Sequence, residues 1–328
     1  MGLQGNCKAR NFLEDTVKRA VALLVLTVMS AMLFACGSPA STTAPAATLG
    51  SDTVATSAAT SAPKPVVNAV VPYADIDFFF GETSGEIKDN KGVVTLEIKA
   101  NGENSVRVEE TTVKFMGVER KMLALRITET GAWVKGTFSE FENNLDFDAF
   151  VARNGGFSIE AFYLDNSTTK ANRGIVCSTE SIGGDAKRSG WGLAENASGA
   201  PYFITGHTAE NEYSSVYATS ASKEELVHVV GVYNAITKRN AIYVNGTLVS
   251  SDSAAGAFTS ANKAEAYEGF NMATIFYIGA DPSASAGKAD ECDFPSNDLT
   301  VIDVKIYACA LDDAAVKAAF AKSTKDFY

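Results

Sequence analysis

The feature that most constrains the fold is a long series of short apolar runs, separated by turn residues, over positions 72–328. Each run is rich in β-branched or aromatic residues, often at every second position, and is bounded by Gly, Asn, Asp or Ser. This alternation is typical of half-buried β-strands, and strands at such short intervals indicate an all-β sandwich or barrel. We therefore predict one antiparallel β-sandwich over residues 72–328, a class that often exceeds about 200 residues in a single domain.

The sharpest local signal is a hairpin within residues 241–249. Alternating apolar residues flank Asn245-Gly246. Asn-Gly favours the two positive-φ positions of a type I′ turn, so the segment predicts two paired strands.

Only the C-terminal end predicts a helix. Asp312 or Asp313 is suited to cap its start, because a side-chain carboxylate there accepts hydrogen bonds from free backbone N–H groups. Val316, Ala319 and Phe320 follow at i, i+3 and i+4, and they share one face.

The first 36 residues predict export and lipidation. A net-positive segment precedes an uncharged apolar run over residues 20–35, which is the order of a secretory signal. This run is shorter than the ~20 residues that span a bilayer as a helix. Its end, residues 33–36 (LFAC), resembles the lipobox of bacterial lipoproteins, and the resemblance implies a diacylglyceryl group on Cys36 and cleavage before it. The alternatives are an uncleaved short anchor and a chance cysteine.

Residues 37–71 then change to Ser, Thr, Ala and Pro. Such a composition buries too little apolar area to offset the entropy of ordering, so it predicts a flexible tether. The predicted organisation is a signal peptide (1–35), a lipidated cysteine with its tether (36–71) and the sandwich (72–328). Several acyl chains on one residue anchor stably. We expect the domain outside the cytoplasm, held to the bacterial cell membrane by lipid.

Charge and histidine content exclude several functions. The chain has 39 acidic and 28 basic residues, a net charge of −11, whereas a nucleic-acid partner requires a basic face. Two histidines leave little room for a His-rich metal site or a Ser/His/Asp active site.

Five stretches, in order, resemble the concanavalin A-like, laminin G-like jelly-roll domains of bacterial surface proteins. They are residues 157–162 (FSIEAF), 190–193 (GWGL), 228–233 with 242–246 (HVVGVY, IYVNG), 278–282 (IGADP), and 302–307 with 310–311 (IDVKIY, AL). The chain departs from the family at residues 226–228, where Leu-Val-His replaces Trp-His-His. The resemblance implies an antiparallel jelly roll.

Individual residues in these stretches carry their own expectations. Phe157, Ile159 and Ala161 share one face of a strand. Trp191, between two glycines, is expected to pack between the sheets. His228 is expected to be hydrogen-bonded within the fold rather than catalytic. Asp303 is expected to face outward or to hold a loop.

The sequence favours a non-catalytic domain. Laminarinase-type enzymes of this fold carry E-x-D-x-x-E on one strand, and no stretch here has this pattern. The nearest, residues 142–148, is predicted to be a solvated acidic loop. A glycoside hydrolase remains a remote alternative, through a pair of carboxylates distant in sequence.

The loop that follows residue 280 is a candidate calcium site. Asp281, Asp290 and Asp293 supply carboxylate oxygens, the ligands that Ca²⁺ requires, although their spacing matches no fixed pattern. The alternative is a loop that is merely solvated.

Three cysteines remain outside the predicted signal segment: Cys177, Cys292 and Cys309. They allow at most one internal disulfide, and Cys292 with Cys309 is the candidate pair. The alternative is that all three stay reduced.

Two hypotheses of function follow. In the first, the sandwich is a binding module for carbohydrate or a surface protein partner, and exposed aromatic rings make the contact because sugar faces stack on them. The candidate rings are Tyr202, Tyr213, Tyr217 and Tyr267. In the second, the domain is a structural spacer or an assembly subunit of a surface complex.

Overall fold

The computed structural model describes residues 70–77, 87–100, 102, 105–141, 144–168, 171–182, 187–207, 213–219, 224–253, 256–260, 274–282 and 292–328. These residues belong to a compact unit, Lys64–Tyr328. The predicted signal, Cys36, residues 37–69 of the tether, Tyr267 and Asp290 lie outside the described residues. Among the helices in the described part of the chain, none is long and apolar enough to cross a membrane.

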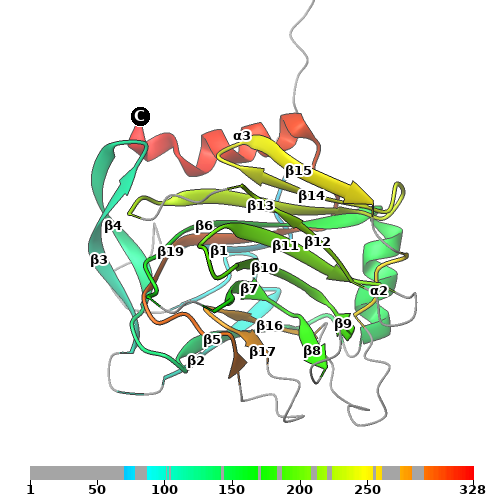
Figure 1. Cartoon of the computed structure of the whole chain (residues 1–328), viewed down its shortest axis with the longest axis horizontal. Helices are drawn as coiled ribbons and strands as arrows, with labels where there is room; N and C mark the ends of the chain where they lie inside the picture. The colour runs from blue at the N-terminus through cyan, green and yellow to red at the C-terminus, as the bar shows by residue number, and fades with distance from the viewer. Residues whose placement is uncertain are drawn as a thin grey trace, which may run out of the picture. The chain divides into compact units, whose positions relative to one another are not determined.

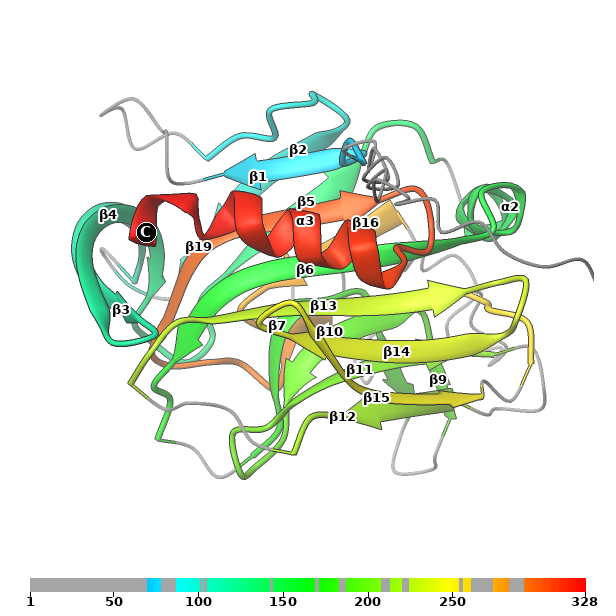
Figure 2. The ribbon, with the colours of Figure 1, turned by 90° about the horizontal axis from the view of Figure 1, so that it is seen from above.

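Two antiparallel sheets stack on each other and form a sandwich (Figures 1 and 2), as predicted. Sheet A has the order β15-β14-β13-β6-β19-β4-β3, with β1 also paired to β19. Its strands are β1 (Ala74–Asp77), β3 (Val106–Phe115), β4 (Val118–Ile127), β6 (Gly156–Asp165), β13 (Val227–Asn234), β14 (Arg239–Val244), β15 (Thr247–Ser253) and β19 (Leu299–Tyr307).

Sheet B has the order β12-β11-β10-β7-β16-β5-β2. Its strands are β2 (Val94–Lys99), β5 (Trp133–Phe138), β7 (Arg173–Cys177), β10 (Trp191–Glu195), β11 (Pro201–Gly206), β12 (Tyr213–Tyr217) and β16 (Ile275–Ile278). Two small pairs lie outside the sheets: β8 (Glu180–Ile182) with β9 (Lys187–Ser189), and β17 (Asp281–Pro282) with β18 (Cys292–Asp293).

The main core fills the space between the sheets. Phe157, Ile159 and Ala161 of β6 all point into it, as their alternation predicts. Trp191 is fully buried there, with ring centroids 6.3 Å from Phe157 and 6.0 Å from Phe276. Complete burial of an apolar side chain contributes about 1.5–3 kcal/mol to the free energy of folding. The many buried side chains of this layer therefore stabilise the stacking of the two sheets.

Helix α3 (Asp313–Ser323) crosses the outer face of sheet A (Figure 2) and is followed by the short helix η3 (Lys325–Phe327). Asp312 caps α3 by accepting a hydrogen bond from the backbone N–H of Ala315 at 2.8 Å. Val316 is buried against the sheet, and Phe320 is partly buried. The predicted C-terminal helix is therefore confirmed.

The predicted hairpin is also present. Asn245 and Gly246 have φ of 49° and 74°, as a type I′ turn requires, and they join β14 to β15. A Cβ on Gly246 would meet the Phe320 ring at 2.9 Å. The turn therefore needs glycine both for its backbone angle and for contact with the helix.

The acidic loop predicted at residues 142–148 is wrong. Helix α2 (Asn144–Arg153) occupies most of it. Its buried side chains lie at i, i+3 and i+4: Phe147, Phe150 and Val151. Asp148 is held as well, because its Oδ1 accepts hydrogen bonds from the backbone N–H and the hydroxyl of Ser260 at 2.8 and 2.6 Å. The acidic residues of α2 thus alternate with an apolar stripe of helical spacing, which is what makes the segment a helix.

The candidate disulfide is wrong too. Cys292 packs with Trp133 on the outer side of sheet B, whereas Cys309 packs with Val316 beneath α3, on the outer side of sheet A. Strand β19 separates them, and nine residues at ~3.3 Å each carry the chain ~30 Å. The three described cysteines are thiols.

Candidate functional site

A groove of about 530 Å³ opens on the outer face of sheet A, beside the start of α3. This volume falls within the ~300–1,000 Å³ of small-ligand sites. Its apolar lining comes from Val232, Ala241, Tyr243, Leu248 and Leu311. Its polar lining comes mainly from Asn234, Arg239, Ser251, Asp312 and Asp313. We call this the helix groove.

The floor of the helix groove is fixed by a bond between sheet and helix. The hydroxyl of Tyr243, on β14, donates to Oδ1 of Asp313 at 2.7 Å. Burial, together with this carboxylate, raises the pKa of Tyr243, so its hydroxyl stays a donor. The contact holds the first turn of α3 against the strands that form the rest of the groove.

The rim of the helix groove offers both donors and acceptors to a ligand. Arg239 is exposed, and its Nη2 donates to the hydroxyl of Ser251 at 3.0 Å. Asp312 and Asp313 are exposed on the helix side. Leu248 is 44% exposed and adds apolar surface at the edge strand β15. A ligand with apolar faces and several hydroxyl or charged groups suits this combination.

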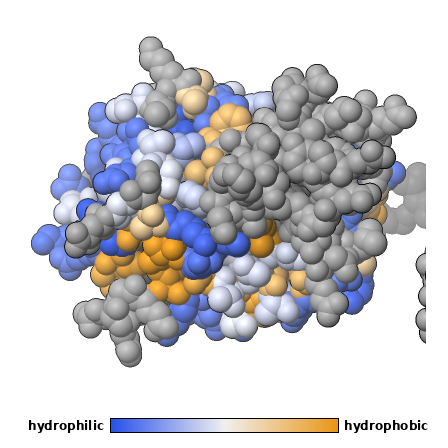
Figure 3. All heavy atoms as spheres, turned by 90° about the horizontal axis from the view of Figure 1, so that it is seen from below, coloured by the Kyte–Doolittle hydropathy of each residue, from blue (hydrophilic) through white to orange (hydrophobic). Residues whose placement is uncertain are grey.

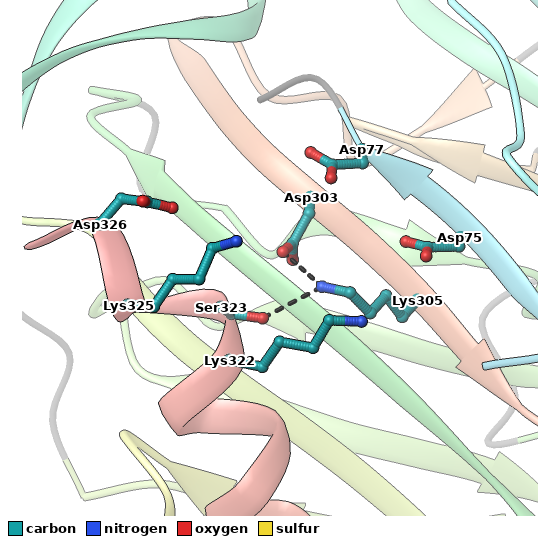
Figure 4. Close-up of a pocket in the computed structure, with 8 residues that line it drawn as sticks. All are labelled: Asp75, Asp77, Asp303, Lys305, Lys322, Ser323, Lys325 and Asp326. Carbon is teal, nitrogen blue, oxygen red and sulfur yellow. Dashed lines mark hydrogen bonds and ion pairs between the residues drawn. The ribbon is translucent and has the colours of Figure 1, made fainter. Parts of the chain in front are cut away.

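A second, smaller cavity of about 50 Å³ lies between β1, β19 and the end of α3 (Figure 4). Charged side chains line it, among them Asp75, Asp77, Lys322 and Lys325. At its base the ammonium of Lys305 contacts Asp303 and the hydroxyl of Ser323, the latter at 3.0 Å. A cavity of this size holds a few water molecules.

Beneath that cavity lies a buried network centred on Glu160. Its carboxylate accepts hydrogen bonds from four side chains: His228, Lys305, Tyr307 and Ser323. Burial opposes ionisation, but the Lys305 ammonium and the bond from His228 hold the pKa of Glu160 well below its usual range. His228 is thus hydrogen-bonded within the fold, as expected.

Asp303 does not face solvent, contrary to one expectation. It is 6% exposed and pairs with Lys305 under α3. Alternation along β19 places Asp303 on the outer face correctly, but the helix covers that face. The cluster ties α3 to sheet A.

Two carboxylates distant in sequence do meet, at Asp165 and Glu195, but Arg173 lies between them. Its guanidinium pairs with both, at 2.9 Å to Glu195, and all three side chains are at most 4% exposed. Burial and the Asp165 charge raise the pKa of Glu195 to about 7. Because the pair is enclosed and bound to Arg173, it is not an open acid–base pair for hydrolysis.

The predicted tyrosines separate into buried and exposed rings. Tyr202 is 5% exposed, so the expectation that it presents its ring to solvent is wrong. Tyr217 stacks on it, with ring centroids 5.2 Å apart and an interplanar angle of 29°. Tyr217 and Tyr213 are 47% and 37% exposed. Both lie on β12, at the edge of sheet B.

The calcium candidates are brought together only in part. Strand pairing places Asp281 directly opposite Asp293. Asp281 is buried and accepts a hydrogen bond from the hydroxyl of Thr179 at 2.5 Å. Among the described residues, no group of three or more His, Cys, Asp or Glu side chains is arranged to hold a metal ion. A calcium ion here stays a prediction.

Figure 3 views the molecule from the side of sheet B. It shows an apolar area open at the lower left of the view, next to hydrophilic surface. The helix groove lies on the other sheet, so the two surfaces face different directions.

Sequence reasoning did not find the helix groove. Tyr243 and Asp313 are 70 positions apart, and nothing in either local pattern indicates that they touch. For Asp312 and Asp313 the sequence predicts only the role of a helix cap. The Asn-Gly turn was the one available signal, because it fixes which residues of β14 and β15 share a face.

Residues 139–317, more than half of the chain, match the family described as the Concanavalin A-like lectin/glucanases superfamily. The chain therefore belongs to this family, and its sandwich is the concanavalin A-like jelly roll that the five stretches predict. No curated protein matches the chain.

Solved structures that match the chain include binding domains of botulinum neurotoxins. The binding domain of neurotoxin DC in complex with SialylT has 14% identity and a TM-score of 0.49, over 77% of this chain and 51% of that one. The same domain in complex with rat synaptotagmin II has 14% identity and a TM-score of 0.48, over 76% and 51%. The serotype D binding domain has 12% identity and a TM-score of 0.49, over 78% and 53%. The chain thus spans about half the length of these domains.

Proposed function

We propose that this protein is a lipid-anchored surface protein whose sandwich binds carbohydrate in the helix groove without chemical turnover. The observation that carries the proposal is the composition of the groove: an apolar floor under a rim that holds a guanidinium, an amide and two carboxylates. Sugars present apolar ring faces and many hydroxyl groups, and planar polar side chains bind such hydroxyls well.

The anchor rests on the sequence. The apolar run, the LFAC end and the Ser/Thr/Ala/Pro segment support a domain that is carried at the far end of a tether. A binding module is suited to that position, because a flexible linker lets it sample a volume above the membrane. Membership of a family named for lectins as well as glucanases is compatible with binding alone.

The groove also lacks the arrangement that hydrolysis needs. Its carboxylates, Asp312 and Asp313, are adjacent at the start of one helix, and each already accepts a hydrogen bond within the fold. An acid and a base that flank a scissile bond normally come from facing positions about 5–9 Å apart. The groove is therefore suited to hold a ligand rather than to cleave it.

A glycan array tests the proposal. The tether and domain, residues 37–328, are applied as the wild type and as Arg239→Ala and Asp313→Asn. We expect the wild type to bind a set of glycans and each variant to lose at least about tenfold in affinity, because a charge-assisted hydrogen bond is removed from the rim. The matched control is Lys317→Ala, an exposed cation on α3 outside the groove.

Two results would contradict the proposal. Wild-type binding that both groove variants retain would place the site elsewhere. Binding to none of the glycans would favour the spacer or assembly role.

A further inference from the structure

We infer that Tyr213 and Tyr217 form a second binding surface, separate from the helix groove, for the interior of an uncharged polysaccharide chain. We call it the tyrosine ledge: the outward face of β11 and β12. Its members are Tyr202, Ile204, Tyr213, Ser215 and Tyr217. It lies on sheet B, so it does not depend on the groove of sheet A.

Strand register places the ledge residues on one face. Tyr202 is paired directly with Tyr217, and Ile204 with Ser215. Val216, between the ledge positions of β12, points into the main core, so its neighbours point outward. Tyr213 follows the same alternation and emerges on the same side as Tyr217.

Tyr217 is held in a fixed orientation before any ligand arrives. Its ring stacks on Tyr202, which is itself buried among Cys177, Ala194 and Ile204. A ring with such a support loses little conformational entropy when it binds, yet 47% of Tyr217 remains exposed. A flat, half-exposed ring on a rigid strand is the arrangement on which a sugar face stacks.

The spacing of the two rings indicates a chain rather than a single sugar. Tyr213 and Tyr217 are four residues apart on one strand, and a strand advances ~3.3 Å per residue, so the two positions lie ~13 Å apart. One monosaccharide is too short to reach both rings. A ligand that contacts both must run along β12 for several sugar units.

The charge pattern indicates an uncharged polymer. The ledge side chains carry no formal charge, and the chain as a whole carries −11. A polyanion such as a polyuronate is repelled by that net charge and finds no cation on the ledge. Ser215, between the two rings, offers a hydroxyl for sugar hydroxyl groups.

The same residues do not resemble the centre of a protein interface. Ile204 and Tyr202 are 2% and 5% exposed, so the open apolar surface consists of two separate rings with Ser215 between them. Protein interfaces usually place a continuous, well-packed apolar core at their centre. Two spaced rings are better matched by the repeating faces of a glycan chain.

Native affinity electrophoresis tests the inference. Residues 37–328 are run through gels that contain galactomannan, xyloglucan, mixed-linkage β-glucan or polygalacturonate. We expect retardation by at least one neutral polymer and none by polygalacturonate. Tyr213→Ala and Tyr217→Ala should each weaken the retardation about tenfold or more, and Tyr217→Phe should preserve it. Tyr328→Ala, which removes a ring that is 72% exposed elsewhere, should migrate like the wild type.

Several outcomes would overturn the inference. Equal retardation of the wild type and both alanine variants would place neutral-polymer binding elsewhere. Competition by the free monosaccharide as strong as that by a hexasaccharide would show that no chain is needed. If no gel retards the wild type, the ledge does not bind polysaccharide; a change in sedimentation on Tyr217→Ala would then identify it as a protein contact.

The two proposals fail independently. Loss of binding in Arg239→Ala with intact retardation in Tyr217→Ala would support the helix groove alone. The reverse result would support the tyrosine ledge alone.

Discussion

Lys305 is the cation that two buried carboxylates of sheet A share. Its side chain is buried, and its ammonium contacts two buried carboxylates, Glu160 and Asp303. A buried charge costs several kcal/mol of desolvation unless close partners compensate for it. One cation therefore compensates for two buried carboxylates beneath α3, so its removal affects both of them.

Replacement of Lys305 should expose this dependence. Lys305→Met leaves both carboxylates without their cation, so we expect the free energy of unfolding to fall by about 3–5 kcal/mol. Urea denaturation at pH 7, followed by tryptophan fluorescence, measures the loss. The double variant Lys305→Met, Asp303→Asn should recover part of it, because one stranded charge is gone. Lys317→Met, on the exposed side of α3, is the control and should change stability by less than about 0.5 kcal/mol.

The direction and burial of single side chains are predicted correctly where strand alternation alone determines them. The inward direction of Phe157 and the burial of Trp191 follow from strand periodicity and are confirmed. The predicted solvent exposure of a side chain is wrong where another part of the fold covers that side chain. Asp303 and Tyr202 both lie on outward faces, but α3 covers the first, and Tyr217 stacks on the second.

At the scale of elements, features defined by consecutive residues were predictable. The hairpin at Asn245-Gly246 and helix α3 depend on turn chemistry and capping within a few positions. Helix α2 is not predicted although its apolar stripe is also local, because the acidic residues beside the stripe favour a solvated loop. The helix groove cannot be predicted from local sequence patterns, because it forms where α3 meets strands from a different part of the chain.

The N-cap of α3 should contribute measurably to stability. Asp312→Ala removes the bond to the Ala315 N–H, so we expect a loss of about 1 kcal/mol in the free energy of unfolding. Asp312→Asn, which caps about equally well, should keep most of it. Thermal denaturation of the wild type and the two variants, compared under the same conditions, checks this expectation. Equal stability of both variants would show that the packing of Val316, rather than the cap, positions the helix.

At the scale of the whole molecule, two buried titrating groups act in opposite directions. Burial lowers the pKa of His207 from its ordinary 6.5 to about 4, so the unfolded chain binds this proton more readily. Its contribution to stability is present above pH 6.5 and is lost as the pH falls towards 4. Glu195, raised from 4.5 to about 7, behaves in reverse: its contribution is present below pH 4.5 and is lost as the pH rises through 7.

These two dependences should largely cancel in the wild type, because each amounts to roughly 3 kcal/mol over nearly the same pH window. Glu195→Gln keeps a side chain of equal size beside Arg173 and leaves Arg173 with Asp165 as a neutral pair. The free energy of unfolding of this variant should then show the pH dependence that His207 causes. Relative to the wild type, the free energy of unfolding of this variant should rise by up to about 3 kcal/mol between pH 4.5 and 7. His207→Gln should show the opposite slope, with stability falling over the same interval. Urea denaturation at four pH values measures both differences, and the subtraction removes the groups that the variants share. Curves that run parallel to the wild type in both variants would mean that neither group titrates differently in the folded and unfolded chains.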